Sequence, residues 1–310
     1  MPDDINKKQE HYPSVLIVIV NFNGATDTIE CIKSLEKISF KNYQIQIVDN
    51  SSDEENKKLL ITKLSNKIKV IYSSTNLGFA GGNNIGIKES LKKNYDYTLL
   101  LNNDTLVEPD FLTNLTVEAQ KNCEIGILAP KINYNLKRNF VWSAGGRISR
   151  IRGSGFSKYE NKKDSKEIKN RDVEFVSGCC LLIKNEVFEK VGLLDENYFL
   201  YLEDTDFCQR VINAGFKIRL VASSKIYHKV NSTTARHQTS LPIYYTTRNR
   251  LYFSKKLLGN WYYAVLSYLF ITMHFKFLYW YLTNKKDNII AVRRAFKDFH
   301  INKMGKTEDL

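Results

Sequence analysis

The feature that most constrains this chain is an alternation, between residues 15 and 130, of short β-branched apolar runs with longer amphipathic segments. The first run, Val15–Val20, is continuously apolar, which is typical of a strand covered on both faces. Further apolar runs at 45–48, 68–72 and 97–101 are separated by segments with helical spacing. Strands that alternate with helices predict an α/β fold with a mostly parallel central sheet.

Polar side chains follow the ends of these predicted strands. Asn21 and Asn23 come after the first run, Asp49 after the second, and a glycine-rich loop at 76–82 after the third, before a helix expected at 83–93. Ligands bind at the carboxyl edge of open parallel sheets. Asn and Asp also gather at strand exits because of local turn chemistry. Each residue alone is weak evidence, but three such exits on one edge predict a ligand site.

The pattern changes after residue 130. Residues 131–175 are rich in Lys, Arg, Asn and Ser with interspersed glycines, which predicts a hairpin and flexible loop. A strand at 173–184, a helix at 203–214 and a strand at 216–221 are expected next, the last followed by a loop that carries His228. From Leu241 onward the chain is expected to be helical, and residues 1–13 are expected to form a flexible N-terminus.

Charge is distributed unevenly along the 310 residues, which have a net charge of +13. Residues 131–175 carry 12 Lys or Arg against 5 acids, and residues 248–310 carry 12 against 4, so the rest of the chain is near neutral. A basic partner surface is therefore expected in those two segments. Nucleic-acid binding is not favoured, because the basic residues accompany an apolar tail rather than a platform for stacking bases.

The number and spacing of the cysteines and the lengths of the apolar runs indicate where in the cell the protein is expected to work. The five cysteines form no C-x-x-C pair and are odd in number, which favours reduced thiols and a cytoplasmic location. The first apolar run is too short for a signal-peptide core. The longest apolar stretch, Trp261–Leu282, has the length of a membrane span but contains His274 and Lys276 and many aromatic residues. It predicts a segment at a membrane interface rather than a span.

Asp104 is the first candidate for chemistry, because it directly follows the predicted strand at 97–101, after Asn102 and Asn103. A carboxylate there suits a hard cation such as Mg²⁺, which takes oxygen ligands from one or two carboxylates and from substrate phosphates. The alternative is an aspartate that caps the turn before Pro109. If His228 lies beside Asp104, its imidazole nitrogen would favour Mn²⁺ over Mg²⁺.

Three acids, Glu203, Asp204 and Asp206, open the predicted helix at 203–214. Adjacent helical side chains point about 100° apart, so Glu203 and Asp204 cannot both face one substrate atom; one is expected to be catalytic and another structural. The alternative is that the acids complement the helix dipole. An apolar wall from residues 199–202 would raise a carboxyl pKa toward the range of a general base.

Other features are less specific. Trp142 is either a core anchor or a platform for a sugar. Gly305-Lys-Thr307 resembles the end of a P-loop, but His300 stands where a glycine is needed and no strand precedes it. A G-x-G-x-x-G fingerprint after the first strand and a G-x-S-x-G nucleophile elbow are both absent.

Taken together, the motifs resemble those of the family 2 glycosyltransferases, close to the rhamnosyltransferase branch. The resemblance covers about residues 14–250 and rests on five segments in order: Val18-Ile-Val-Asn-Phe-Asn-Gly24, Val48-Asp-Asn-Ser-Ser52, Asn76-Leu-Gly-Phe-Ala-Gly-Gly-Asn-Asn84, Leu101-Asn-Asn-Asp104 and Glu203-Asp204. It implies a GT-A fold, the nucleotide-diphospho-sugar transferase fold. Residues 14–240 would be the catalytic domain, with a nucleotide-sugar half (14–130) and an acceptor half (131–240), followed by a basic, aromatic-rich helical tail (241–310).

The resemblance also implies roles for individual residues. Asp204, paired with Glu203, matches the general base, and Trp142 matches a loop on the acceptor or sugar side. Asp104 and His228 match contacts to a divalent metal, Mn²⁺ or Mg²⁺; the first acid of the family's D-x-D motif is Asn102 here, so Asp104 carries most of that contact. The nucleotide sugar would be bound by Asn21, Asn23, Asp49, Asn76, Gly81, Asn83, Asn102 and Asn103.

The chemistry implied is an inverting transfer in a single displacement, with Asp204 deprotonating an acceptor hydroxyl and the metal stabilising the leaving diphosphate. The donor would be dTDP-rhamnose or a UDP-sugar, and the acceptor a glycan or a lipid-linked sugar. Residues 241–310 would lie on the inner face of the plasma membrane, making the protein peripheral; the alternative is a helical subdomain or a homodimer interface. A rival to the enzyme is a nucleotide-sugar-binding scaffold or inactive partner subunit, suggested by Asn102.

Overall fold

The computed structural model describes residues 12–65, 68–230 and 240–307. Its strands are β1 (Val15–Asn21), β2 (Tyr43–Asp49), β3 (Lys69–Tyr72), β4 (Tyr97–Leu101), β5 (Thr105–Val107), β6 (Ile125–Tyr134), β7 (Val141–Ser143), β8 (Gly146–Ser149), β9 (Ser154–Ser157), β10 (Arg171–Val173), β11 (Cys180–Lys184) and β12 (Lys217–His228). The helices are α1 (Ala25–Leu35), α2 (Glu54–Lys63), α3 (Gly78–Lys92), α4 (Phe111–Gln120), α5 (Asn185–Val191), the 3-10 turn η1 (Glu196–Tyr198), α6 (Glu203–Asn213), α7 (Ser240–Leu257), α8 (Trp261–Leu282) and α9 (Lys286–His300).

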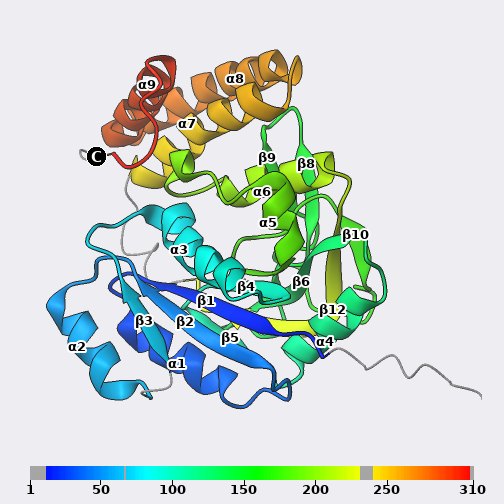
Figure 1. Ribbon diagram of the computed structural model, residues 1–310. Helices are drawn as coiled ribbons and strands as arrows, with labels where there is room; N and C mark the ends of the chain where they lie inside the picture. Colours follow the sequence, from blue (N-terminus) through cyan, green and yellow to red (C-terminus); the bar gives the residue numbers. More distant parts are fainter. Residues whose placement is uncertain (1–11, 66–67, 231–239, 308–310) are drawn as a thin grey trace, which may run out of the picture.

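One mixed sheet organises the chain, with strand order β10-β12-β6-β11-β4-β1-β2-β3 and with β5 and β7 added beside β12 and β6 (Figure 1). Strands β3, β2, β1 and β4 are all parallel, as the alternation of strands and helices predicts. The antiparallel β11 separates β4 from the parallel pair β6 and β12. The expected α/β fold is therefore confirmed, and β8 and β9 form the expected hairpin.

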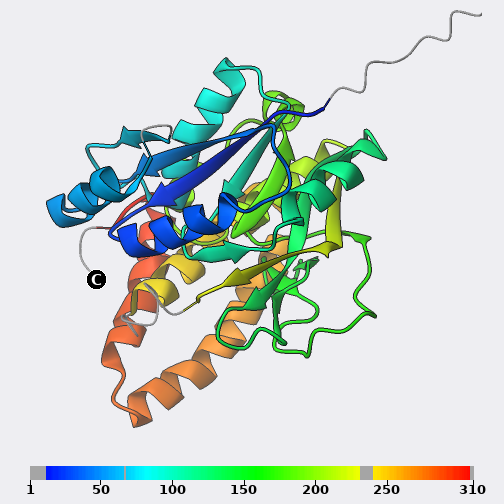
Figure 2. The same ribbon diagram turned by 90° about the horizontal axis from the view of Figure 1, so that it is seen from below.

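Helices cover both faces of the parallel half (Figures 1 and 2). Along β1, Val15, Ile17 and Ile19 belong to the same apolar cluster as residues of α1, whereas Leu16 and Val18 belong to the cluster on the α3 side. Because alternate side chains of a strand point to opposite faces, a continuously apolar strand is what two covering layers require.

Helix α3 lies unusually close to β1 because it carries glycines on the side that faces the sheet. A Cβ built on Gly82 would lie 2.9 Å from Val20, and one on Gly86 would lie 2.3 Å from Val18. The helix begins at Gly78, five residues before the expected start at 83, so the prediction of an open loop over 76–82 was wrong. Gly81 and Asn83 therefore lie in the buried first turns of α3. The glycines of this segment allow close packing of the helix and do not form a flexible loop.

Two strand predictions also need correction. The strand predicted at 216–221 continues to His228, so His228 ends β12 instead of lying in a loop; the reason is that β12 keeps pairing with β6 and β5 up to that residue. The strand expected at 173–184 is two strands, β10 and β11, which pair with different neighbours. The prediction for residues 1–13 falls on positions that, up to residue 11, lie outside the described part of the chain.

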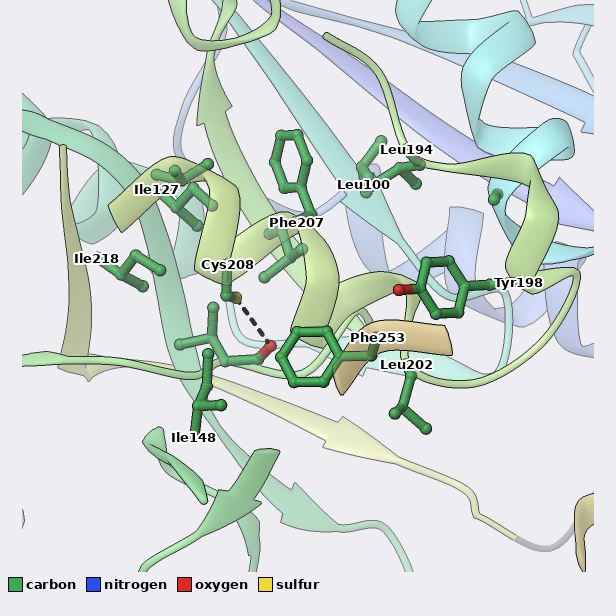
Figure 3. Packing of buried hydrophobic residues seen from close by; sticks show 14 of the residues in the cluster. Leu100, Ile127, Ile148, Leu194, Tyr198, Leu202, Phe207, Cys208, Ile218 and Phe253 are labelled. Atoms are coloured by element: carbon green, nitrogen blue, oxygen red, sulfur yellow. Dashed lines mark hydrogen bonds between the residues drawn. The ribbon is translucent and has the colours of Figure 1, made fainter. Parts of the chain in front are cut away.

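The expected C-terminal helices are present as α7, α8 and α9, stacked beyond α6 in both views (Figures 1 and 2). Phe253 of α7 packs in one continuous cluster with Phe207 of α6 and with Leu100 and Ile127 of the sheet (Figure 3). Helix α7 thus shares the core of the domain. Among the described helices, none combines the length and apolarity needed to cross a bilayer.

Gly78 provides a test of how tightly this packing is defined. Its φ is +70°, and an added Cβ would lie 2.2 Å from the carbonyl oxygen of Phe199. Gly215, directly after α6, also has a positive φ of +86° but open space around it, so it is the control. We expect Gly215→Ala to lower the free energy of unfolding by about 1 kcal/mol, and Gly78→Ala by about 2 kcal/mol more, measured by urea denaturation. Equal losses of unfolding free energy in the two variants would mean that the loop at Phe199 moves away from the added methyl group at little cost.

Candidate active site

Strand register brings the predicted polar residues to one edge of the sheet. Asn21 at the end of β1 pairs with Asp49 at the end of β2, and Asp49 pairs with Tyr72 at the end of β3. On the other side of β1, β4 ends at Leu101 and is followed by Asn102–Asp104. The four parallel strands therefore deliver their exits side by side, as expected for a ligand-binding edge.

Asn21 and Asp49 are both fully buried and bind each other. The Asn21 Nδ2 donates to Asp49 Oδ2 at 2.8 Å, and its Oδ1 accepts from the Thr28 hydroxyl at 2.8 Å. The backbone N–H of Ser52 donates to the other carboxylate oxygen of Asp49 at 3.0 Å. Asn23 is exposed, and its Oδ1 accepts from the N–H of Asp53. The geometry favours Asn21 as the residue that positions Asp49.

The start of α3 is held by an asparagine that the sequence analysis did not single out. Asn50 is buried, and its amide donates to Asn76 Oδ1 at 3.1 Å and to the Gly78 carbonyl at 3.0 Å, while its Oδ1 accepts from the N–H of Leu77. The Asn83 amide donates within its own helix, to the carbonyl of Phe79. The only sequence signal for Asn50 was its position directly after Asp49.

Tyr72 and Asn84 were also missed. Tyr72 stands in register with Asp49 at the same edge, with its ring largely exposed. The buried Asn84 joins α3 to the segment before α6, because its amide donates to the carbonyl of Leu194 and to the carboxylate of Glu196, both at 2.9 Å. Asn84 ends the motif Asn76–Asn84 quoted above but was given no role there, because its partners lie more than one hundred residues away in sequence.

Asp104 and His228 come together as the sequence analysis anticipated. The Asp104 Oδ1 lies 3.1 Å from His228 Nε2, and the Trp142 ring packs edge-on against the imidazole, with 4.4 Å between ring centroids. Burial alone would raise the pKa of Asp104, but the hydrogen bond and positive charge of His228 lower it below its ordinary value. The carboxylate is therefore held in its charged form, the form that binds cations.

The separation of this pair suits a divalent cation. Two adjacent ligands at about 2.1 Å from one cation lie about 3 Å apart, close to the observed separation. For Nε2 of His228 to be a ligand, Nδ1 must carry the ring proton, and Nδ1 is buried with no hydrogen-bond partner in the described part of the chain. Within residues 12–65, 68–230 and 240–307, no group of three His, Cys, Asp or Glu could hold a metal. Substrate oxygens would have to complete the coordination.

Asn102 and Asn103 connect this pair to the rest of the edge. The Asn103 amide donates to the carbonyl of Gly24 and to the Thr28 hydroxyl, which ties the exit of β4 to α1. The backbone N–H of Asn102 donates to the carbonyl of Cys179 at 2.9 Å. The N–H of Gly178, one residue earlier, donates to Asp204 Oδ2 at 3.0 Å. Asp204 and the Asp104 segment are thus anchored on two consecutive residues.

Glu203 and Asp204 occupy different environments, as expected for neighbours on a helix. Asp204 is partly exposed and also accepts from the N–H of Thr205 at 2.7 Å. Burial raises its pKa, while the N–H groups of Gly178 and Thr205 act in the opposite direction. Glu203 is 6% exposed, and its Oε2 has no partner among the described residues. Burial and then the charge of Asp204 raise the pKa of Glu203 well above its ordinary value.

The turn before α6 has an unusual backbone that one distant side chain supports. Phe199, Tyr201 and Leu202 have φ of 58°, 69° and 72°, the left-handed region that such residues rarely adopt. The buried Asn249 of α7 places its Nδ2 within 2.8 to 2.9 Å of three carbonyl oxygens of this segment, those of Tyr198, Leu200 and Tyr201. Asn249 therefore fixes the direction in which α6 presents Asp204.

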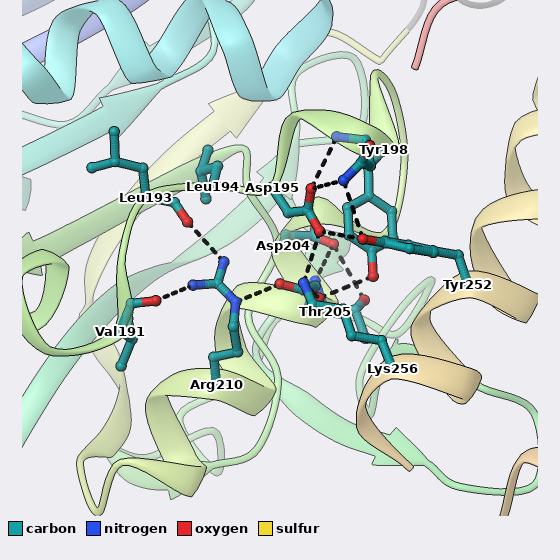
Figure 4. A network of polar contacts seen from close by, with 12 residues as sticks. Val191, Leu193, Leu194, Asp195, Tyr198, Asp204, Thr205, Arg210, Tyr252 and Lys256 are labelled. Atoms are coloured by element: carbon teal, nitrogen blue, oxygen red, sulfur yellow. Dashed lines mark hydrogen bonds and ion pairs between the residues drawn. The ribbon is translucent and has the colours of Figure 1, made fainter. Parts of the chain in front are cut away.

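The third acid, Asp206, is structural. It is fully buried and accepts from Arg210 Nε at 2.6 Å, from Lys256 Nζ at 2.7 Å and from the Tyr198 hydroxyl at 3.0 Å. Lys256 also binds Asp195, and Arg210 donates to two carbonyls of the preceding loop (Figure 4). The network locks α6 to α7 directly behind Asp204.

Comparisons with known proteins agree with this geometry. Residues 16–192 match the family described as Glycosyl transferase family 2. The low-salt glycan biosynthesis hexosyltransferase of Haloferax volcanii is 28% identical over 248 residues, covering 79% of this chain and 76% of that protein. The dTDP-rhamnosyl transferase of Shigella flexneri is 24% identical, covering 78% and 80%. The N-acetylglucosaminyl-diphospho-decaprenol L-rhamnosyltransferase of Mycobacterium tuberculosis is 23% identical, covering 72% and 78%.

Solved structures show the same fold. A mannosyltransferase from Pyrobaculum calidifontis, in complex with GDP-Man and Mn²⁺, superposes with a TM-score of 0.57 at 11% identity, covering 98% of this chain and 91% of that one. GalNAc-T7 with UDP, GalNAc and Mn²⁺ gives 0.58 at 19% identity, covering 71% and 44%. The likeness confirms the GT-A fold. With more than half of its length matched by the family and its polar edge built as described, this chain is a glycosyltransferase and belongs to glycosyl transferase family 2.

Proposed function

We propose that this glycosyltransferase moves a hexose, with rhamnose the favoured sugar, from a nucleoside-diphosphate sugar to a hydroxyl of a glycan or lipid-linked acceptor, with inversion, in cell-surface glycan biosynthesis. The observation that carries the proposal is the anchoring of Asp204 and the Asp104 segment on consecutive residues, Gly178 and Cys179. This anchoring would hold the base and the leaving-group site in a fixed relative position, as a transfer by single displacement requires.

Asp204 is proposed as the general base. Its backbone hydrogen bonds hold the carboxylate in place, while partial burial raises its pKa toward the range in which a base works near neutral pH. It would remove the proton from the acceptor hydroxyl as that oxygen attacks the anomeric carbon. Glu203, buried and favoured in its neutral form, would support the turn rather than exchange protons. No second carboxylate is needed, because no covalent intermediate forms.

Asp104 and His228 are proposed to hold Mn²⁺ or Mg²⁺, which, when bound, would offset charge on the leaving diphosphate. The mixed oxygen and nitrogen donors favour Mn²⁺. Asp49 and the exposed Asn23, with the loop that Asn50 and Asn76 shape, would contact the nucleoside, and Trp142 would flank the transferred sugar. Relatives named as rhamnosyltransferases support rhamnose and, in one case, an acceptor on a diphospho-lipid.

Helix α8 is proposed to lie on an anionic membrane surface. One side of α8 packs inward through Val265, Leu269 and Met273. Its other sides leave large apolar residues in solvent: Trp261, Tyr263, Phe270, Ile271, Phe275, Leu278, Tyr279, Tyr281 and Leu282. Twelve Lys or Arg against four acids in residues 248–310 complement anionic lipids, each contributing on the order of 1 kcal/mol near such a surface.

The base is tested by isosteric substitution. We expect Asp204→Asn to lower the transfer rate by about 10²- to 10⁴-fold while donor binding stays within about twofold, because only proton removal is lost. Glu203→Gln is the matched control and should keep most activity. The wild-type rate should fall on acidification, because a base with a raised pKa is protonated at a higher pH than an ordinary aspartate. Wild-type turnover in Asp204→Asn would contradict the assignment.

The metal pair and the donor are tested by calorimetric titration with dTDP and UDP, each with and without Mn²⁺. We expect binding of one nucleotide that strengthens with Mn²⁺, and at least a tenfold loss in Asp104→Ala or His228→Ala. Asp110→Ala, an exposed acid between β5 and α4, is the control and should bind normally. Metal-independent binding unaffected by Asp104→Ala would reject the metal assignment.

Membrane association is tested by flotation with vesicles of phosphatidylglycerol or of phosphatidylcholine. We expect binding to the anionic vesicles only, weakened by salt and by Phe270→Ser with Phe275→Ser, whose side chains are 68% and 73% exposed. Ile61→Ser on α2, 65% exposed, is the control and should not change binding. Concentration-dependent self-association without vesicle binding would assign α8 to a homodimer interface instead.

A further inference from the structure

Arg250 on α7 is a half-buried cation whose hydrogen-bonding requirements the described chain does not satisfy. Its Nε is buried without a hydrogen-bond partner, and no carboxylate of the described residues forms an ion pair with it. Arg248, two residues earlier, shows the contrast: its guanidinium donates to the Tyr244 hydroxyl and to the carbonyls of Lys303 and Gly305. Hydrogen bonds within the fold therefore account for the position of Arg248, whereas none accounts for that of Arg250.

Two further cations from other elements lie within electrostatic reach of Arg250, and both have exposed side chains. Arg152 comes from the turn between β8 and β9, and Lys276 comes from α8. Burial lowers the pKa of Arg250, and the charge of Arg152 lowers it further, with only Tyr268 acting in the opposite direction. Burial likewise lowers the pKa of Lys276, and so does the charge of Arg250. No ion pair joins an acid of the described residues to Arg152, Arg250 or Lys276, and the charge of Arg250 repels those of the other two.

The turn between β8 and β9 lies beside α8 (Figure 1) and packs against residues of both α7 and α8. A Cβ built on Gly153 would lie 3.0 Å from Arg250 Cγ, 2.5 Å from Ser254 Oγ and 3.1 Å from Val265 Cγ1. Only a glycine with its φ of +61° admits this approach. The fold thus holds the turn that carries Arg152 against Arg250, and an anion bound there would offset the repulsion between the two charges.

We propose that Arg152, Arg250 and Lys276 bind the diphosphate group of a lipid-linked acceptor. Guanidinium groups match phosphate oxygens in pairs, and a third cation suits a group with more than one negative charge. The site opens beside α8, whose exposed apolar side chains fit the lipid chain. Asn249, the neighbour of Arg250, supports the turn that presents Asp204, so a diphosphate there would bring the attached sugar toward the base. This inference rests on the proposed function.

The test uses the full chain with farnesyl diphosphate and inorganic pyrophosphate, in EDTA so that the cation of the donor site is removed. We expect farnesyl diphosphate to bind, excess UDP not to displace it, and Arg250→Gln to weaken it at least about tenfold. Arg150→Gln, an exposed arginine of the same turn, is the control and should bind as the wild type does. Wild-type affinity in Arg250→Gln, or displacement by UDP, would overturn the proposal.

Two readouts distinguish a lipid-diphosphate site from a structural arginine and from a site for free anions. Because Arg250 is unpaired, Arg250→Gln should melt at the wild-type temperature or above, and it should lose the rise in melting temperature that farnesyl diphosphate causes. A large drop in the melting temperature of Arg250→Gln without ligand would make Arg250 structural and overturn the proposal. If inorganic pyrophosphate bound as tightly as farnesyl diphosphate, the site would be one for a free anion, and the proposal of a lipid-linked ligand would be overturned. The Asp204 and Asp104 variants test the catalytic proposal separately.

Discussion

The position of Asp204 depends on one side-chain amide, that of Asn249. A backbone with three non-glycine residues at positive φ is costly, and the segment 198–202 adopts it because three of its carbonyls bind Asn249. A buried amide that satisfies several carbonyls at once cannot be replaced by water. The C-terminal helix α7 thereby helps to shape the proposed catalytic region around Asp204, and the ion network of Asp206, Arg210 and Lys256 holds the same junction between α6 and α7.

The opposite side of the site depends on glycine. The close approach of α3 to β1 through Gly82 and Gly86 leaves no room for a side chain, and it brings the start of α3 down to the sheet edge. There Asn50 binds Asn76 and Gly78, and Gly78 in turn abuts the carbonyl of Phe199. The donor side and the turn before α6 are thus in direct contact. A shift in one must move the other, which favours a site that is largely formed before substrate binds.

Two arginines on α7 show how similar residues divide between fold and function. Arg248 is buried with its hydrogen bonds satisfied and with its guanidinium over the rings of Tyr244 and Tyr245. Arg250 is half-buried near the like charges of Arg152 and Lys276, and its Nε is buried without a hydrogen-bond partner among the described residues. The two arginines stand two residues apart in sequence, and their environments alone distinguish them.

The sequence by itself determined the parallel half of the sheet, the polar edge, the helix at Glu203 and the helical C-terminus, because each follows from local periodicity or from a motif whose neighbours are close in sequence. It also singled out Asp104, His228 and Asp204. The start of α3 and the end of β12 were misjudged, because tertiary packing against Val18 and pairing with β6 decided them. Only the tertiary structure decided that Asn249 holds the turn before Asp204 and that the turn at Gly153 packs against Arg250. Those contacts join segments that no local pattern relates, and long-range burial determines which polar groups must find partners there.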